Sequence, residues 1–242
     1  MVEKRGLAVS PDVELIGRSV EVSTLSTDLT LRKSRLILGP GGIGKTRLIH
    51  EALSTSEQPF VSITKPAALH DLLVMLAKHL SCRSPRFLDL RDATTVHLKP
   101  LVVNGLSANP QCVILEDLEE VEPRMYRFLQ KLYYVPGACL IATGRSRSRL
   151  GRLQRLLWDP REELVLKPLS RRESLQLFEE ACRAFRLHLF DSDGFRQRVI
   201  QAAHGNPGQI LSMCRLAGQP EYRSGDHIKF APLWIDVLSA FV

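Results

Sequence analysis

One stretch, "LILGPGGIGKTRLIHEAL" at residues 36–53, constrains the fold of this chain more than any other. A short apolar run, "RLILG" at 35–39, leads into four glycines, a lysine and a threonine, and "KTRLIHEAL" at 45–53 then has a helical pattern. The order strand, glycine-rich loop, helix is the context in which G-x-x-x-x-G-K-[ST] binds phosphate. The plain alternative, a tight turn without a ligand, does not explain why the spacing, the flanking segments and the residue types all agree with this motif.

The loop chemistry follows from its residue types. Glycines allow backbone angles at which successive N–H groups point inward at phosphate oxygens, and the following helix adds the positive end of its dipole. Lys45 is expected to bridge the β and γ phosphates, and the Thr46 hydroxyl to bind Mg²⁺. The candidate nucleotide-binding residues of this segment are Gly39, Pro40, Gly41, Gly42, Ile43, Gly44, Lys45, Thr46 and Arg47.

The apolar runs predict an α/β fold, a five-stranded parallel doubly wound sheet. Strands are expected at 35–39, 60–63, 112–116, 138–143 and 163–169, and these runs are mostly continuous, as in strands covered on both faces. Helices are expected between them, at 45–53, 68–80, 96–106, 122–134 and 148–158. After Pro168 only helical patterns follow, at 170–185, 192–204 and 207–217, the first opened by a Ser170/Glu173 capping box. We therefore expect a core at 1–168, a small helical lid at 169–217 and an apolar tail at 218–242.

An acidic pair, Glu116 and Asp117, ends the apolar run 112–116. The carboxyl ends of parallel strands are where open α/β sheets bind ligands, so this pair is the candidate partner of Thr46 in holding magnesium. In such pairs one carboxylate orients the metal and the other polarises the attacking water. By position Glu116 would face the metal and Asp117 the water, but the side chains could exchange roles, and the sequence leaves this split open.

Charge and cysteine content limit the classes of partner. The formal net charge of +7 favours polyanions, without choosing among nucleotides, nucleic acids and acidic membranes. The five cysteines are widely spaced and form no metal-binding cluster, which is typical of reduced core thiols in a cytoplasmic protein. The segment at 1–12 lacks the apolar stretch of a secretory signal. The stretch 230–242 is apolar but too short to span a membrane, so we expect a docked helix rather than membrane contact, with an interfacial or partner-binding tail as the alternative.

At this point the chain resembles P-loop ATPases of the STAND and AAA+ type. "LIGRSVEVSTL" at 15–25 is similar to the hhGRxxE segment of these families, which implies that Ile16, Gly17 and Arg18 lie near the adenine. "GPGGIGKT" has the wording of STAND phosphate loops. "LIATGRS" at 140–146 resembles a strand ending in T-x-R, whose arginine, here Arg145, senses the γ-phosphate. "HGNPGQI" at 204–210 resembles the G-x-P motif of STAND lids, which places Pro207 against the adenine.

The resemblance implies an ATP-binding, slowly hydrolysing regulatory ATPase with ATP and Mg²⁺ as cofactors, in which Lys45, Glu116, Asp117 and Arg145 carry the chemistry. STAND modules are followed by other domains, so we expect a protein partner or self-association. A second hypothesis is a DNA-associated ATPase, such as a transposition or loading accessory, that uses the basic segment Arg145–Arg155. A third is a scaffold that binds ATP without hydrolysing it. A solvated basic helix face is the plain alternative for the arginines.

Overall fold

The computed structural model describes residues 13–56, 58–66, 68–80, 82, 89–157, 159–187, 192–225 and 227–241. These residues form two compact units. The sheet unit contains the described residues of 20–40 and 49–166. The helical unit contains those of 13–19, 41–48 and 167–241, so the glycine-rich segment 41–48 belongs with the helices that follow residue 167.

The sheet unit is built on five parallel strands in the order β2-β3-β4-β1-β5. Their bounds are β1 Arg35–Leu38, β2 Phe60–Thr64, β3 Cys112–Leu118, β4 Cys139–Gly144 and β5 Glu163–Val165. The predicted five-stranded parallel sheet is confirmed. The fifth strand ends earlier than the predicted residue 169, because after the Leu166 N–H donates to the Leu38 carbonyl the chain leaves the sheet.

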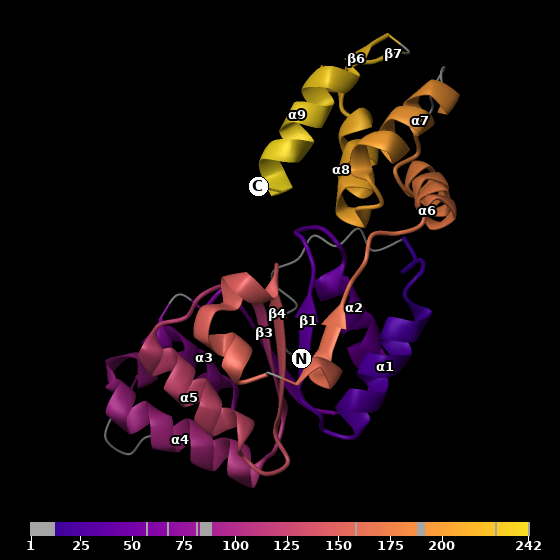
Figure 1. The fold of residues 1–242 in the computed structure, drawn as a ribbon. Helices are drawn as coiled ribbons and strands as arrows, with labels where there is room; N and C mark the ends of the chain where they lie inside the picture. Colours follow the sequence, from indigo (N-terminus) through magenta and orange to yellow (C-terminus); the bar gives the residue numbers. More distant parts are fainter. Residues whose placement is uncertain are drawn as a thin grey trace. The chain divides into compact units, whose positions relative to one another are not determined.

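Helices cover both faces of this sheet (Figure 1). The helices α3 Leu69–His79, α4 Thr95–Ala108 and α5 Pro123–Tyr133 lie on one side, and α1 Ser19–Thr30 and α2 Lys45–Ser54 on the other. The short 3-10 helix η1 spans Leu90–Asp92 and η3 spans Pro160–Glu162. Apolar side chains of β1 to β4 pack with α3, α4 and α5 in one buried cluster. The two covered faces explain why the strands have continuous apolar patterns.

Helix α1 was not predicted, because its sequence "SVEVSTLSTDLT" is rich in serine and threonine. The hydroxyls of Thr24, Thr27 and Thr30 each donate a hydrogen bond to the carbonyl four residues earlier, at 2.8 to 2.9 Å. The donors of these side chains therefore have their partners within the helix. Its buried Asp28 pairs with Arg35 at the start of β1, with 2.6 Å between Oδ2 and Nη2. Tertiary packing outweighs weak helix propensity here.

The predicted helix at 148–158 is wrong. The structure has a 3-10 segment, η2 Arg147–Arg155, interrupted at Gly151, whose φ of 51° and ψ of −121° are not helical. Apolar periodicity predicts a continuous helix, but Gly151 interrupts it, and Leu150 and Leu153 on either side of the kink are both buried. Trp158 lies outside the described residues.

The helical unit contains α6 Arg171–Ala184, α7 Ser192–Ala203, α8 Pro207–Ala217 and α9 Phe230–Phe241, with the 3-10 helix η4 Pro220–Tyr222 and a hairpin of β6 Arg223–Ser224 and β7 His227–Ile228. The predicted helices at 170–185, 192–204 and 207–217 are confirmed. The capping box is present: the Glu173 N–H donates to the Ser170 hydroxyl at 3.3 Å and the Ser170 N–H to the Glu173 carboxylate at 2.7 Å.

The helix α9 is part of the helical unit's own core. Its Leu233 and Val237 are buried in the same apolar cluster as residues of α6, α7 and α8. The Tyr222 hydroxyl, on η4, donates to the Asp236 carboxylate at 2.6 Å and fixes α9 further. The division into a core at 1–168, a lid at 169–217 and a tail at 218–242 stays a prediction. Among the described residues, no helix has the length and apolar content needed to cross a membrane.

Candidate functional site

The carboxyl edge of the sheet unit gathers the predicted catalytic residues of that unit. Gly39 and Pro40 follow β1, Glu116 and Asp117 lie near the end of β3, and Arg145 follows β4. The Gly39 N–H donates to the Gly144 carbonyl at 3.2 Å, which ties the start of the glycine-rich loop to the end of β4. The strand order places β4 between β1 and β3.

The two carboxylates of the acidic pair lie in different surroundings. Glu116 is buried, with 3% of its surface exposed, and accepts a hydrogen bond from the Ser62 hydroxyl of β2 at 2.8 Å. Asp117 is exposed and has a φ of 52°, because the β3–β4 register shifts between Leu115 and Leu118. Its N–H donates to the Thr143 hydroxyl at 2.9 Å. The bulge therefore directs the two neighbouring acids into different environments.

The glycine-rich segment 41–48 belongs to the helical unit. Gly42 and Gly44 have φ values of 76° and 102°, which only glycine adopts readily. A Cβ on Gly42 would also clash with the Phe241 ring and lie 2.8 Å from Asn206 Oδ1. Helix α2 begins at Lys45, which is buried, and the Leu48 N–H closes its first turn on the Gly44 carbonyl at 2.9 Å.

The first turn of α8 holds this segment by its backbone. The Asn206 side-chain amide donates to the Gly41 carbonyl at 2.8 Å, and the Gly208 N–H donates to the Gly42 carbonyl at 2.9 Å. Asn206 is also the N-cap of α8, since its Oδ1 accepts from the Gln209 N–H at 3.3 Å. Sequence reasoning missed Asn206. Its place before Pro207 at a helix start marks it as a cap, but no local pattern indicates a bond to a residue 165 positions earlier.

Two further predicted nucleotide contacts, Pro207 and Ile16, are placed in the helical unit. Pro207 is the first residue of α8, and its Cγ lies 3.9 Å from the position that a Cβ on Gly44 would take. Ile16 is buried in the apolar cluster together with Val13 and Leu169. Packing of Ile16 between elements of the cluster gives it a structural role. Contact of Pro207 or Ile16 with an adenine stays a prediction.

Gly17, Arg18 and Arg47 complete the predicted set. Gly17 has a φ of 68°, and a Cβ there would clash with the Glu173 carboxylate. Arg18 is buried, and its guanidinium donates to the Lys167 carbonyl at 2.5 Å. The Arg47 guanidinium donates to the Val13 carbonyl at 3.0 Å. These contacts fasten the segment 13–18 to α2 and to the start of the helical region, whatever else it binds.

Phe241, near the end of α9, is a second contact that the sequence did not indicate. Its ring lies against Gly42 and Gly208. A Cβ on Gly42 would clash with this ring, and a Cβ on Gly208 would lie 3.1 Å from it. The glycine-rich segment thus packs against α8 and α9 within one unit. Sequence periodicity can show that α9 has a buried face, but not which loop that face covers.

The basic segment that the sequence singled out does not form one cationic face. Arg147 is half-buried, pairs with Glu163, and donates to the carbonyls of Gln154 and Leu157 at 3.5 and 3.3 Å. Arg149, Arg152 and Arg155 are exposed, and Arg149 lies 3.8 Å from Glu119. The alternative of a solvated basic helix face differs from what the structure has, because Gly151 breaks the helix and Arg147 pairs with Glu163.

The backbone of the glycine-rich segment fits a nucleotide. Gly42 and Gly44 have positive φ angles, and in such loops successive N–H groups can point at the oxygens of one anion. Magnesium in nucleotide sites is bound by one or two protein oxygens and by phosphates, and Thr46, Glu116 and Asp117 are the residues whose oxygens could serve there. Among the described residues, no group of three or more His, Cys, Asp or Glu side chains could hold a metal by itself.

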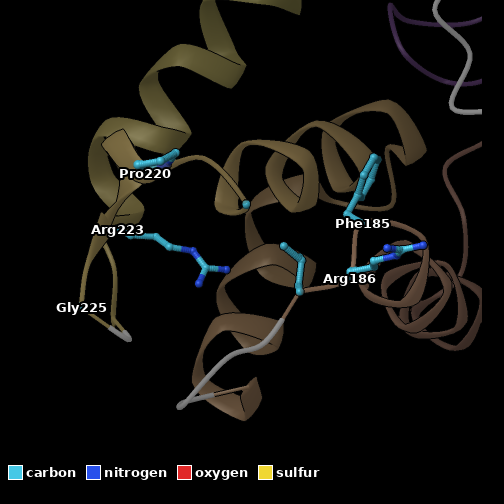
Figure 2. A pocket seen from close by; sticks show the side chains of 7 residues that line it. Phe185, Arg186, Pro220, Arg223 and Gly225 are labelled. Atoms are coloured by element: carbon cyan, nitrogen blue, oxygen red, sulfur yellow. The ribbon is translucent and has the colours of Figure 1, made fainter.

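A separate pocket lies elsewhere in the helical unit, between the end of α6 and the β6–β7 hairpin (Figure 2). It has a volume of about 470 Å³ and contains no residue of the glycine-rich segment. Figure 2 shows Arg223 reaching toward its middle and Arg186 extending away from Arg223. The Arg223 Nε donates to the Ala217 carbonyl at 2.8 Å, so this guanidinium is engaged in holding the hairpin to α8.

Comparisons with known proteins place the fold. No protein-family model matches the sequence, and no curated protein matches it significantly. The chain is similar to the Orc1 protein of Aeropyrum pernix, solved in complex with DNA, with a TM-score of 0.64 and 20% identity over 96% of this chain and 66% of that one. A Walker-type ATPase of Pyrococcus abyssi gives a TM-score of 0.65 and 16% identity over 93% and 72%.

A STAND protein with a tetratricopeptide repeat sensor, from Pyrococcus horikoshii, is similar over 99% of this chain and 35% of that one, with a TM-score of 0.56 and 19% identity. The chain thus spans just under two thirds of Orc1 and about a third of the STAND protein. These likenesses and the β2-β3-β4-β1-β5 sheet show that the chain has the α/β P-loop NTPase fold, as the sequence predicted.

Proposed function

We propose that this chain, with its AAA+ type fold, binds ATP and Mg²⁺ at the loop Gly39–Thr46 and works as a slowly hydrolysing, nucleotide-dependent conformational switch. The observation that carries the proposal is the pair of hydrogen bonds from Asn206 and Gly208 to the carbonyls of Gly41 and Gly42. A phosphate bound to the N–H groups of this loop changes the backbone to which α8 is bonded. Nucleotide state is thereby coupled to the helical unit.

Each residue has a stated task in the proposal. Lys45 binds the β and γ phosphates, and Arg145 senses or stabilises the γ-phosphate. Thr46 and the acidic pair hold Mg²⁺, which supplies neutralisation of phosphate charge. Glu116, buried and held by Ser62, suits a fixed metal-orienting role, and the exposed Asp117 suits contact with the attacking water. The two tasks can be exchanged without changing the rest of the proposal.

Binding is tested by titrating fluorescently labelled ATP and ADP into the wild type and Lys45→Ala. We expect Lys45→Ala to lower ATP affinity at least tenfold, and Arg47→Ala, whose guanidinium bonds to Val13, to serve as the neighbouring basic control with a smaller loss. Unchanged ATP affinity in Lys45→Ala would remove the site assignment as a whole. Hydrogen exchange of α8 with ATP and with ADP then measures the switch, and identical exchange in the two states contradicts it.

Hydrolysis is tested by single-turnover measurements with Glu116→Gln and Asp117→Asn. Substitution of the residue that polarises water should lower the rate of the chemical step and leave ATP affinity near that of the wild type. Substitution of the residue that orients the metal should lower both the rate and the ATP affinity. Turnover absent from the wild type, with ATP binding intact, would favour the scaffold that binds ATP without hydrolysing it.

A DNA-associated ATPase is the second candidate. Three exposed arginines, Arg149, Arg152 and Arg155, favour it, and one structural neighbour was solved in complex with DNA. Turnover measured with and without DNA at two salt concentrations separates the candidates, because binding through several cations weakens steeply with salt. Stimulation by DNA that disappears at the higher salt would favour this second function.

A further inference from the structure

A basic pocket lies at the amino edge of the sheet, away from the strand ends that carry Glu116 and Arg145. It has a volume of about 490 Å³, and its lining includes Arg32, Lys33, Ser34, Arg35, Tyr133 and Arg161. Residues 32–34 lead into β1, and Arg161 precedes β5. Because the strands are parallel, all their amino ends meet at this edge, and their carboxyl ends at the other.

The positive charges at this pocket are only partly compensated. Arg35 is paired with the buried Asp28, and the Arg161 guanidinium donates to both carboxylate oxygens of Asp159. Arg32 donates to a neutral group, the Gly137 carbonyl, at 2.7 Å, and among the described residues its guanidinium has no ion pair. The exposed Lys33 ammonium has no ion pair within the part of the chain that the structure describes. Two positive charges therefore remain available to an anion at the rim of one pocket.

The carboxylate that lines the pocket is already engaged. Glu162 accepts a hydrogen bond from the Tyr133 hydroxyl at 3.0 Å. Burial and this neighbouring carboxylate raise the pKa of Tyr133 to about 12, so the hydroxyl stays protonated and keeps Glu162 engaged at neutral pH. This hydrogen bond leaves Glu162 less free to pair with Arg32 or Lys33.

An exposed aromatic ring packs on a residue that lines the pocket. Tyr134 is 72% exposed, and its ring stands edge-on to that of Tyr133, which lines the pocket, with 5.3 Å between the centroids. Cations for the phosphates and an exposed ring for a base are what a single nucleic-acid strand needs. An acidic peptide would use the cations but gain little from the exposed ring.

We propose that this amino-edge surface, defined by Arg32, Lys33 and Tyr134, binds single-stranded nucleic acid, with phosphates at the two cations and a base stacked on Tyr134. The site does not depend on ATP binding and differs from the segment Arg145–Arg155. It is a second polyanion site on the sheet unit, and its ligand is a strand and not a nucleotide.

The test is fluorescence anisotropy of a labelled single strand of about 20 nucleotides, as DNA and as RNA, with the full chain. The double variant Arg32→Glu/Lys33→Glu is compared with Arg152→Glu/Arg155→Glu, which changes the charge equally at exposed residues of the other basic segment. We expect at least tenfold weaker binding in the first and less than threefold in the second. The slope of log binding constant against log salt concentration should be smaller in magnitude by about 1.4 for Arg32→Glu/Lys33→Glu, because each phosphate contact to a single strand contributes about 0.7.

Further arms keep the result interpretable. Lys33→Glu alone breaks no side-chain hydrogen bond or ion pair among the described residues, so its effect does not depend on tolerance of the Arg32 change. Tyr134→Ala should weaken single-strand binding more than duplex binding, and excess ATP with magnesium should not displace the strand. Absence of binding, equal losses in the two double variants, displacement by ATP, or equal competition by polyglutamate would each overturn the proposal.

Discussion

The side-chain amide of Asn206 donates to the Gly41 carbonyl at 2.8 Å, while the Oδ1 of the same side chain caps α8. One residue thus starts a helix and holds the glycine-rich loop. These two tasks use different atoms, since the cap needs an acceptor and the loop needs a donor. They can therefore be separated by substitution.

Asn206→Asp keeps the acceptor that caps α8 and removes the donor to Gly41, whereas Asn206→Ala removes both. We expect Asn206→Asp to change nucleotide affinity, because its carboxylate sets an acceptor against the Gly41 carbonyl oxygen, while the cap of α8 is kept. Ala should in addition cost about 1 kcal/mol, as the loss of a side-chain cap does. Nucleotide titration and urea unfolding measure the two effects. Equal nucleotide affinity in all three proteins would show that the bond to Gly41 has no part in binding.

Gly42→Ala is expected to destabilise the protein, because alanine must adopt a φ near 76° and its Cβ must clash with the Phe241 ring. The cost of such a backbone conformation is about 1–3 kcal/mol. Gly41→Ala is the matched control, since the nearest atom to its Cβ is 3.6 Å away and its φ is ordinary. Urea unfolding should rank the two variants in that order. Adding Phe241→Ala to Gly42→Ala should recover part of the loss, and no recovery would argue against the ring contact.

Much of the sheet unit could be predicted from local sequence patterns. The contacts that hold the glycine-rich segment against α8 and α9 could not. Continuous apolar runs identify strands because both faces of the sheet are covered. The bulge at Asp117 and the contacts of Asn206 and Phe241 depend on packing between distant residues, which no periodicity encodes. Arg147 shows the converse error: an arginine in a basic run was assigned to the surface, although its neighbour in space is Glu163.

The capping box of α6 makes stability depend on pH. Hydrogen bonds from Ser170, and more weakly the positive charge of Arg18, hold the pKa of Glu173 below its ordinary value. A depressed folded pKa means that this stabilisation is present above the unfolded pKa and is lost as pH falls through the folded one. Glu173→Gln keeps an acceptor at the same position but no charge, so it should lose about 0.3–1 kcal/mol at pH 7 and none at low pH. Urea unfolding across the acid range measures this, with Glu179→Gln, exposed on the same helix, as control.

A comparison of Arg147→Ala with Arg149→Ala distinguishes an arginine that stabilises the fold from one that is only exposed in the basic segment. Arg147→Ala leaves Glu163 and two carbonyls without a donor, which should cost about 1–3 kcal/mol of the free energy of unfolding. Arg149→Ala removes only an exposed pair with Glu119 and should change that free energy by less than about 0.5 kcal/mol. Denaturant unfolding compares the two directly. Similar small losses in both would mean that Arg147 is available to a ligand, and the basic segment would again become a candidate for DNA contact.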